Sequence, residues 1–147
     1  MTEPLHLTVD LRCTAEHAFQ VWTTKLSQWW PADHTVTGTQ DTEVFLEGRV
    51  GGLIFERTPA GVVHEWGEIT AWEPPRRLRY RWYLRQDRAD ASEVDITFVD
   101  LGDATRVEIV HSGWERMGAA GPDKRQKNVA GWRGVLPHFV AACDRDD

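Results

Sequence analysis

The chain has 147 residues, of which 41% are hydrophobic and 27% are charged, as is typical of one globular domain. Its formal net charge of −6 argues against nucleic acids and anionic membranes as partners. No stretch approaches the roughly 20 apolar residues of a membrane span, and the N-terminal segment lacks the apolar core of an export signal. We therefore expect one cytoplasmic domain over residues 1–147, with Cys13 and Cys143 reduced.

The first predicted element is a half-buried strand over Leu5–Leu11, where apolar and polar residues alternate. Thr14 is a good N-cap for the segment that follows. Apolar residues at helical spacing from Ala15 to Trp29 predict one helix or two short ones. Pro31 ends this segment.

From Thr35 onward the apolar period becomes two, which predicts a meander of antiparallel strands joined by short turns. The predicted strands span Thr42–Glu47, Leu53–Arg57, Val62–Trp72, Leu78–Arg85, Glu93–Asp100 and Arg106–Ser112. The second and third of these carry apolar residues on both faces, so their facing is left open. A β-bulge between Trp66 and Ile69 would reconcile the pattern.

The last three strands can be put in register by pairing their apolar faces. This pairing predicts Trp82 beside Ile96 and Ile96 beside Ile109. The same parity turns His111 inward, which is unusual for a polar side chain in an apolar row. Arginines at positions 77, 79, 81 and 85 share the opposite face and indicate a solvated outer surface.

A long amphipathic helix is predicted from about Lys124 to Cys143, with Asp123 as a capping residue. Its apolar stripe recurs at steps of three and four residues: Val129, Trp132, Leu136, Phe139 and Cys143. Such a stripe needs a surface to cover, and the concave face of the sheet is available. The stretch 113–124, which contains three glycines and Trp114, is expected to be a long loop before this helix.

Six short motifs occur in an order that resembles a known family. They are Trp29-Trp30-Pro31, Gly51-Gly52, Trp66-Gly67-Glu68-Ile69, Trp72-Glu73-Pro74-Pro75-Arg76-Arg77-Leu78, His111-Ser112-Gly113-Trp114 and Gly131-Trp132. The chain resembles the homologues of the heat-shock-protein-90 ATPase activator, in the START-like (SRPBCC) superfamily, over nearly its whole length.

The resemblance implies an α+β helix-grip fold. A curved antiparallel sheet of about seven strands would wrap around the long C-terminal helix, with short helices after the first strand. It also implies a cavity between sheet and helix. In the superfamily such cavities bind lipids, sterols, polyketides and other apolar molecules, and some members catalyse cyclisation or dehydration. Many bacterial members of the family have no assigned activity.

His111 is the most informative candidate for a site, either as a hydrogen-bonded structural residue or as a polar anchor or base in an apolar pocket. Glu56 is its candidate acid partner. The full set of candidate ligand-binding residues comprises inward-facing aromatic, apolar and polar side chains: Trp30, Glu56, Trp66, Tyr80, Trp82, Ile96, Ile109, His111, Trp114, Trp132 and Leu136. No histidine or cysteine spacing indicates a metal, and no motif indicates a cofactor.

These features leave three hypotheses open. The first is a domain that binds a small apolar or aromatic ligand, with or without an unknown activity. The second is a protein-interaction module that contacts a chaperone, as the co-chaperone's C-terminal domain does. The third is an enzyme similar to polyketide cyclases and dehydratases, which needs two titratable groups converging in the cavity. A pocket of roughly 300 Å³ or more would favour the first, and a filled core with an exposed apolar patch the second.

Overall fold

The computed structural model describes residues 3–84 and 87–145 of the chain. The strands are β1 (Leu5–Leu11), β2 (Glu43–Leu46), β3 (Leu53–Arg57), β4 (Val63–Glu73), β5 (Arg77–Trp82), β6 (Ser92–Asp100) and β7 (Thr105–Ser112). The α-helices are α1 (Ala15–Thr23), α2 (Leu26–Trp29) and α3 (Gly121–Arg145). Three short 3-10 helices complete the fold: η1 (Ala32–His34), η2 (Arg88–Asp90) and η3 (Trp114–Ala120).

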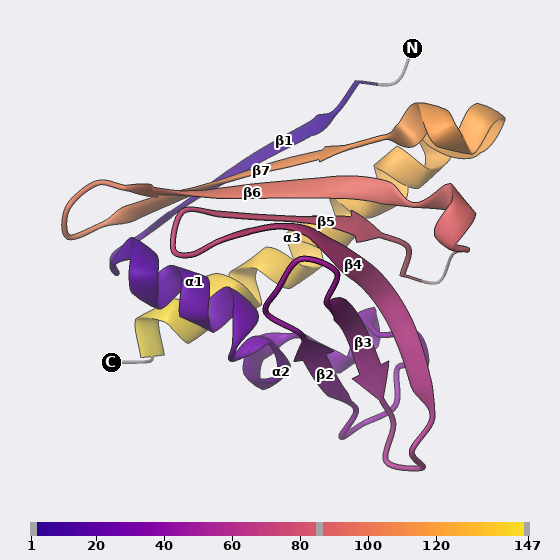
Figure 1. Cartoon of the computed structure of the whole chain (residues 1–147), viewed down its shortest axis with the longest axis horizontal. Helices are drawn as coiled ribbons and strands as arrows, with labels where there is room; N and C mark the ends of the chain where they lie inside the picture. Colours follow the sequence, from indigo (N-terminus) through magenta and orange to yellow (C-terminus); the bar gives the residue numbers. More distant parts are fainter. Residues whose placement is uncertain (1–2, 85–86, 146–147) are drawn as a thin grey trace.

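The seven strands form one antiparallel sheet in the order β1-β7-β6-β5-β4-β3-β2. The sheet curves around α3, which crosses its inner face, while α1 and α2 pack beside the helix (Figure 1). This arrangement confirms the α+β helix-grip fold that the sequence predicts. Thr14 caps α1 by accepting a hydrogen bond from the His17 amide at 3.1 Å. Among the described residues, no helix is long and apolar enough to cross a membrane.

The core lies between the inner face of the sheet and the helices. Its members include Phe19 and Trp22 of α1, Leu78 and Tyr80 of β5, Val94, Ile96 and Phe98 of β6, Val107 and Ile109 of β7, and Trp132, Leu136 and Phe139 of α3. Aromatic rings of different elements pack edge to face, as with Trp22 of α1 and Phe139 of α3, whose centroids lie 4.8 Å apart. Four of the five residues of the predicted apolar stripe, Trp132, Leu136, Phe139 and Cys143, are therefore buried, and Val129 is half-buried.

The open facing of β3 and β4 is resolved by two irregularities in β4. Opposite β3, Trp66 is an extra residue between two paired positions, and opposite β5 the extra residue is Thr70. As a result Trp66 and Ile69 are both buried although their numbers have opposite parity. On β3 the inward residues include Glu56, which is 0% exposed.

The predicted register is confirmed between β6 and β7, where Ile96 pairs with Ile109. Between β5 and β6 it is wrong by four residues, because Trp82 pairs with Ser92 and not with Ile96. The apolar pattern does not fix this register, because a shift by two or four residues keeps the same side chains facing inward. An even shift leaves every side chain on its predicted face. The predicted strand end at position 85 lies outside the described residues.

The stretch 113–124 is not the long loop that its glycines predict. Residues Trp114–Ala120 form the 3-10 helix η3, and α3 follows directly from Gly121, three residues before the predicted start. Pro122 lies in the first turn of α3, where a missing amide hydrogen costs no helical hydrogen bond. Trp114 is 0% exposed and anchors η3 against the sheet.

Two glycines of α3 meet different surroundings. A Cβ atom at Gly134 would lie 2.7 Å from Nε2 of His34, so η1 approaches the helix closely there. A Cβ atom at Gly131, one turn earlier, would meet nothing within 4 Å. The helix is thus tightly packed at one glycine and open at the other.

We predict opposite outcomes for alanine at these two positions. Gly131→Ala should raise the free energy of unfolding by ~0.5–1 kcal/mol, because alanine loses less backbone entropy in a helix and has room here. Gly134→Ala should gain less or lose stability, because His34 must move. Urea denaturation of both variants checks this, and equal gains would contradict the close packing at Gly134.

Candidate functional site

The site is built around a chain of hydrogen bonds that joins α3 to the sheet. Nε1 of Trp132 donates to Nδ1 of His111 at 3.0 Å. The proton of the imidazole is therefore on Nε2, which faces Oγ of Ser92 at 2.7 Å. Ser92 in turn donates to the carbonyl of Trp82 at 3.3 Å. Every donor in this chain has an acceptor, so the buried polar groups are satisfied.

His111 is held as a neutral imidazole. It is 0% exposed, and burial lowers its pKa from 6.5 to about 3. Protonation would also place a second N–H at Nδ1, facing the N–H of Trp132. Trp114 completes the enclosure, because its ring centroid lies 4.4 Å from that of His111 and its Nε1 donates to the His111 carbonyl at 3.1 Å.

A hollow of about 310 Å³ lies directly beside this chain, between the first half of α3 and the ends of β5 and β6. Its described lining is His34, Trp82, Leu84, Ser92, Lys124, Lys127, Asn128 and Gly131. Trp82 and Ser92 thus belong both to the hydrogen-bond chain and to the wall of the hollow. Gly131, which has no side chain, borders the same space.

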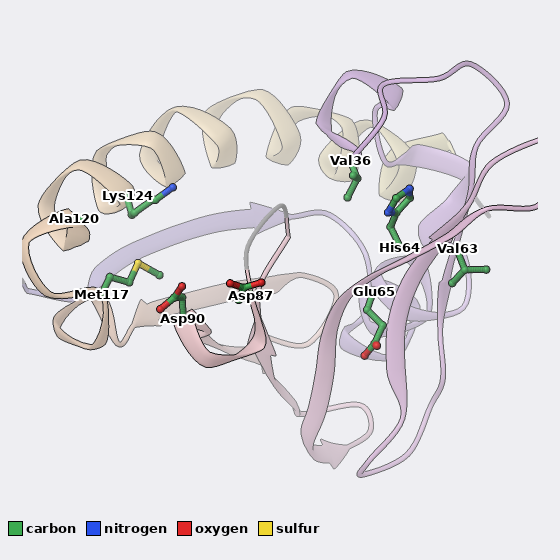
Figure 2. Close-up of a pocket in the computed structure, with 9 residues that line it drawn as sticks. All are labelled: Val36, Val63, His64, Glu65, Asp87, Asp90, Met117, Ala120 and Lys124. Atoms are coloured by element: carbon green, nitrogen blue, oxygen red, sulfur yellow. The ribbon is translucent and has the colours of Figure 1, made fainter.

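A second, more open hollow of about 640 Å³ adjoins the first and shares Lys124 with it. Figure 2 shows its lining, which comes from α3, η3, the β5–β6 connection, β4 and the segment before β2. The side chain of Lys124 extends from α3 into the space that these residues surround (Figure 2). Its three acidic members, Glu65, Asp87 and Asp90, are exposed.

Behind Trp82 stands a group of packed aromatic rings. The ring centroids of Trp30 and Trp66 lie 6.0 and 5.9 Å from that of Trp82, and Tyr80 lies 5.6 Å from it. Trp30 and Trp82 are half-buried, whereas Trp66 and Tyr80 are buried. The aromatic wall of the hollow, formed by Trp82, is therefore held in place by neighbouring rings.

Glu56 serves a different part of the structure from the one predicted. Its Oε1 accepts hydrogen bonds from Nε1 of Trp66 at 2.7 Å and from the Val36 amide at 2.6 Å. Oε2 faces Oγ1 of Thr37 at 3.5 Å. Because both nitrogens of His111 bond elsewhere, the prediction that Glu56 is the acid partner of His111 is wrong. Glu56 instead ties the segment before β2 to the sheet.

Of the candidate residues, one lines a hollow beside α3 and ten line neither of the two. Trp82 lines the smaller hollow. Among the other ten, Trp30 is half-buried and the rest are buried: Glu56, Trp66, Tyr80, Ile96, Ile109, His111, Trp114, Trp132 and Leu136. Sequence reasoning missed Lys124, Asn128 and Gly131, which lie on the first turns of α3, around the start of its apolar stripe. The signal available for them was Gly131 itself, since a glycine in a helix that packs on a sheet leaves space beside it.

The described residues contain no cluster of three or more histidine, cysteine, aspartate or glutamate side chains that could hold a metal. Both cysteines are reduced, with Cys13 partly exposed and Cys143 buried. Burial raises the pKa of the Cys13 thiol. Neither cysteine lines the two hollows beside α3.

The pKa of His111 predicts a pH dependence of stability. The unfolded chain binds a proton near pH 6.5, whereas the native protein binds it only near pH 3. The contribution of neutral His111 is therefore complete above pH 6.5 and is lost as the pH falls, by ~1.4 kcal/mol per pH unit. His111→Gln keeps a donor and an acceptor but cannot titrate, so it should remove this slope.

Urea denaturation of the wild type and the variant between pH 7.5 and 4 measures the difference. The same substitution at His6, which is exposed on β1, is the matched control. Parallel pH profiles for wild type and His111→Gln would contradict a neutral buried imidazole.

Solved structures with the same fold include proteins from several bacteria. The anthrahydroquino-γ-pyrone synthase Txn09, complexed with SUM, is 29% identical with a TM-score of 0.66, covering 96% of this chain and 97% of that one. The self-sacrificing resistance protein CalC from Micromonospora echinospora is 26% identical with a TM-score of 0.71, covering 97% and 95%. Protein MLL2253 from Mesorhizobium loti is 21% identical with a TM-score of 0.68, covering 97% and 99%, and supports the fold alone.

A search of curated proteins finds no match to the chain. The family model described as activator of Hsp90 ATPase homolog 1-like protein matches residues 12–143. This match covers most of the chain, and the motifs, the sheet order and the structural neighbours agree with it. The protein therefore belongs to the family of activator of Hsp90 ATPase homolog 1-like proteins, which has the START-like (SRPBCC) helix-grip fold.

Proposed function

We propose that this domain binds a small apolar or aromatic molecule in the hollow between α3 and the ends of β5 and β6. The observation that carries the proposal is a space of about 310 Å³ between helix and sheet, with the ring of Trp82 on one wall. Ligand pockets typically have this size and combine apolar walls with a small number of polar contacts. Trp82 and Leu84 supply the apolar surface. Polar contacts are available from Ser92, Asn128 and the charged or titratable side chains of the lining, which are His34, Lys124 and Lys127.

One structural neighbour supports an aromatic ligand. Txn09 is named as a synthase of an anthrahydroquino-γ-pyrone, which is a fused aromatic ring system. It shares 29% of its residues with this chain over nearly the full length of both. A flat ring system would fit against the exposed part of Trp82, which Trp30, Trp66 and Tyr80 hold in place.

Binding is better supported than catalysis. His111, the residue best placed to act as a base, uses both ring nitrogens for hydrogen bonds within the protein. It is separated from the hollow by Ser92, which bonds to it. A cyclase or dehydratase needs an acid and a base that reach the substrate together.

A chaperone-binding surface is also less well supported. The large hydrophobic side chains exposed in the described parts of the chain are Val50, Val62, Val63 and Leu101. They lie at three separate turns of the sheet and not on one helix face. The second hypothesis needs a continuous apolar patch.

Filling the hollow from α3 tests the proposal. Gly131→Leu places a side chain into open space, because a Cβ atom at this position meets nothing within 4 Å. The variant should fold with at least wild-type stability, since leucine is a good helix former. It should weaken the binding of the neutral probe N-phenyl-1-naphthylamine by about tenfold or more, because the probe and the leucine compete for one space.

Fluorescence titration measures probe binding, and Ala130→Leu is the matched control on the exposed side of the same turn. The control should bind the probe as the wild type does. The proposal fails if the wild type does not bind the probe, or if Gly131→Leu binds it with unchanged affinity.

A further inference from the structure

We infer that the ligand of this cavity carries an acidic group, such as a carboxylate or sulfonate, and that Lys124 binds it. The inference rests on the proposed function and specifies its ligand as an aromatic acid. It places the ring system against Trp82 and the acidic group where the two hollows meet.

The charges around the smaller hollow have one sign. Its described lining contains two lysines and a histidine but no carboxylate, although the chain carries a net charge of −6. The neutral polar groups beside them are the hydroxyl of Ser92 and the amide of Asn128. A cavity of this kind attracts an anion and disfavours a cation.

Of the two lysines, Lys124 is the one placed to bind a ligand. Lys127 is exposed and forms an ion pair with Asp123 at 3.3 Å. Lys124 is half-buried, and within the described parts of the chain it has no carboxylate partner within ion-pair distance. Its stem can cover apolar surface while the ammonium reaches the cavity, as lysine side chains commonly do.

The carboxylates of the larger hollow do not neutralise Lys124. Glu65 accepts a hydrogen bond from the Tyr83 hydroxyl at 2.9 Å and lies 3.7 Å from Arg88. Asp90, which ends η2, and Asp87, which precedes η2, are both exposed to solvent. The ammonium of Lys124 therefore has no carboxylate partner within ion-pair distance in the described parts of the chain, and an anionic ligand at this point would supply one.

Two probes with the same ring system test this inference. 8-Anilino-1-naphthalenesulfonate differs from N-phenyl-1-naphthylamine only by its sulfonate group, so the ratio of their affinities isolates the contribution of the charge. Lys124→Gln removes the ammonium, and Arg133→Gln makes the same change in net charge at an exposed position of α3 outside both hollows.

We expect Lys124→Gln to weaken the sulfonate probe by about tenfold or more, because it loses a charge-assisted contact. The neutral probe should change less than about twofold, and Arg133→Gln should change neither affinity by more than about twofold. As a second measurement on the wild type, raising the salt concentration should weaken the sulfonate probe selectively.

The outcomes separate this inference from the proposed function. If the neutral probe binds and Gly131→Leu blocks it, but Lys124→Gln leaves the sulfonate probe unchanged, the acidic ligand is refuted and the cavity stands. Equal weakening of both probes by Lys124→Gln also refutes the charge contact. If neither probe binds the wild type, or Gly131→Leu affects neither, the proposed function fails and the inference fails with it.

Discussion

The hydrogen bond from Trp132 to His111 connects the two halves of this fold. It links the C-terminal helix to the inner face of β7, and His111 passes the connection on to Ser92 at the start of β6. The bond works only with a neutral imidazole, whose single acceptor nitrogen faces the indole N–H. Deep burial keeps the imidazole neutral, so packing and hydrogen bonding impose the same protonation state on His111.

This connection determines where the domain can leave space. On the C-terminal side of Trp132, α3 packs against the sheet through large aromatic side chains such as Phe139, which is 0% exposed. On the N-terminal side of Trp132, the helix carries Gly131, Asn128 and Lys124, and the space between helix and sheet is not filled. A ligand in this space would contact Ser92 and Trp82 without breaking the core, because the hydrogen bonds behind them are already satisfied.

The arrangement also separates stability from recognition. The residues with the strongest structural roles, His111 and Glu56, are fully buried and fully bonded within the protein. Most residues around the hollow are partly or fully exposed, although Ser92 is buried, and Lys124 has no carboxylate partner in the described parts of the chain. Such groups can be exchanged between family members at little cost to the fold, which agrees with one fold serving a synthase and a resistance protein among its neighbours.

The sequence by itself determined the strand and helix types, the inner face of each late strand and the pairing of β6 with β7, because side-chain period reports local facing. It also placed His111 inside. Only the tertiary structure decided the β5–β6 register, since any even shift preserves the same pattern. Likewise, period distinguishes inward from outward but not a packed residue from one beside a hollow. Which inward side chains border open space therefore depends on how α3 sits on the sheet, and that depends on contacts between residues far apart in the chain.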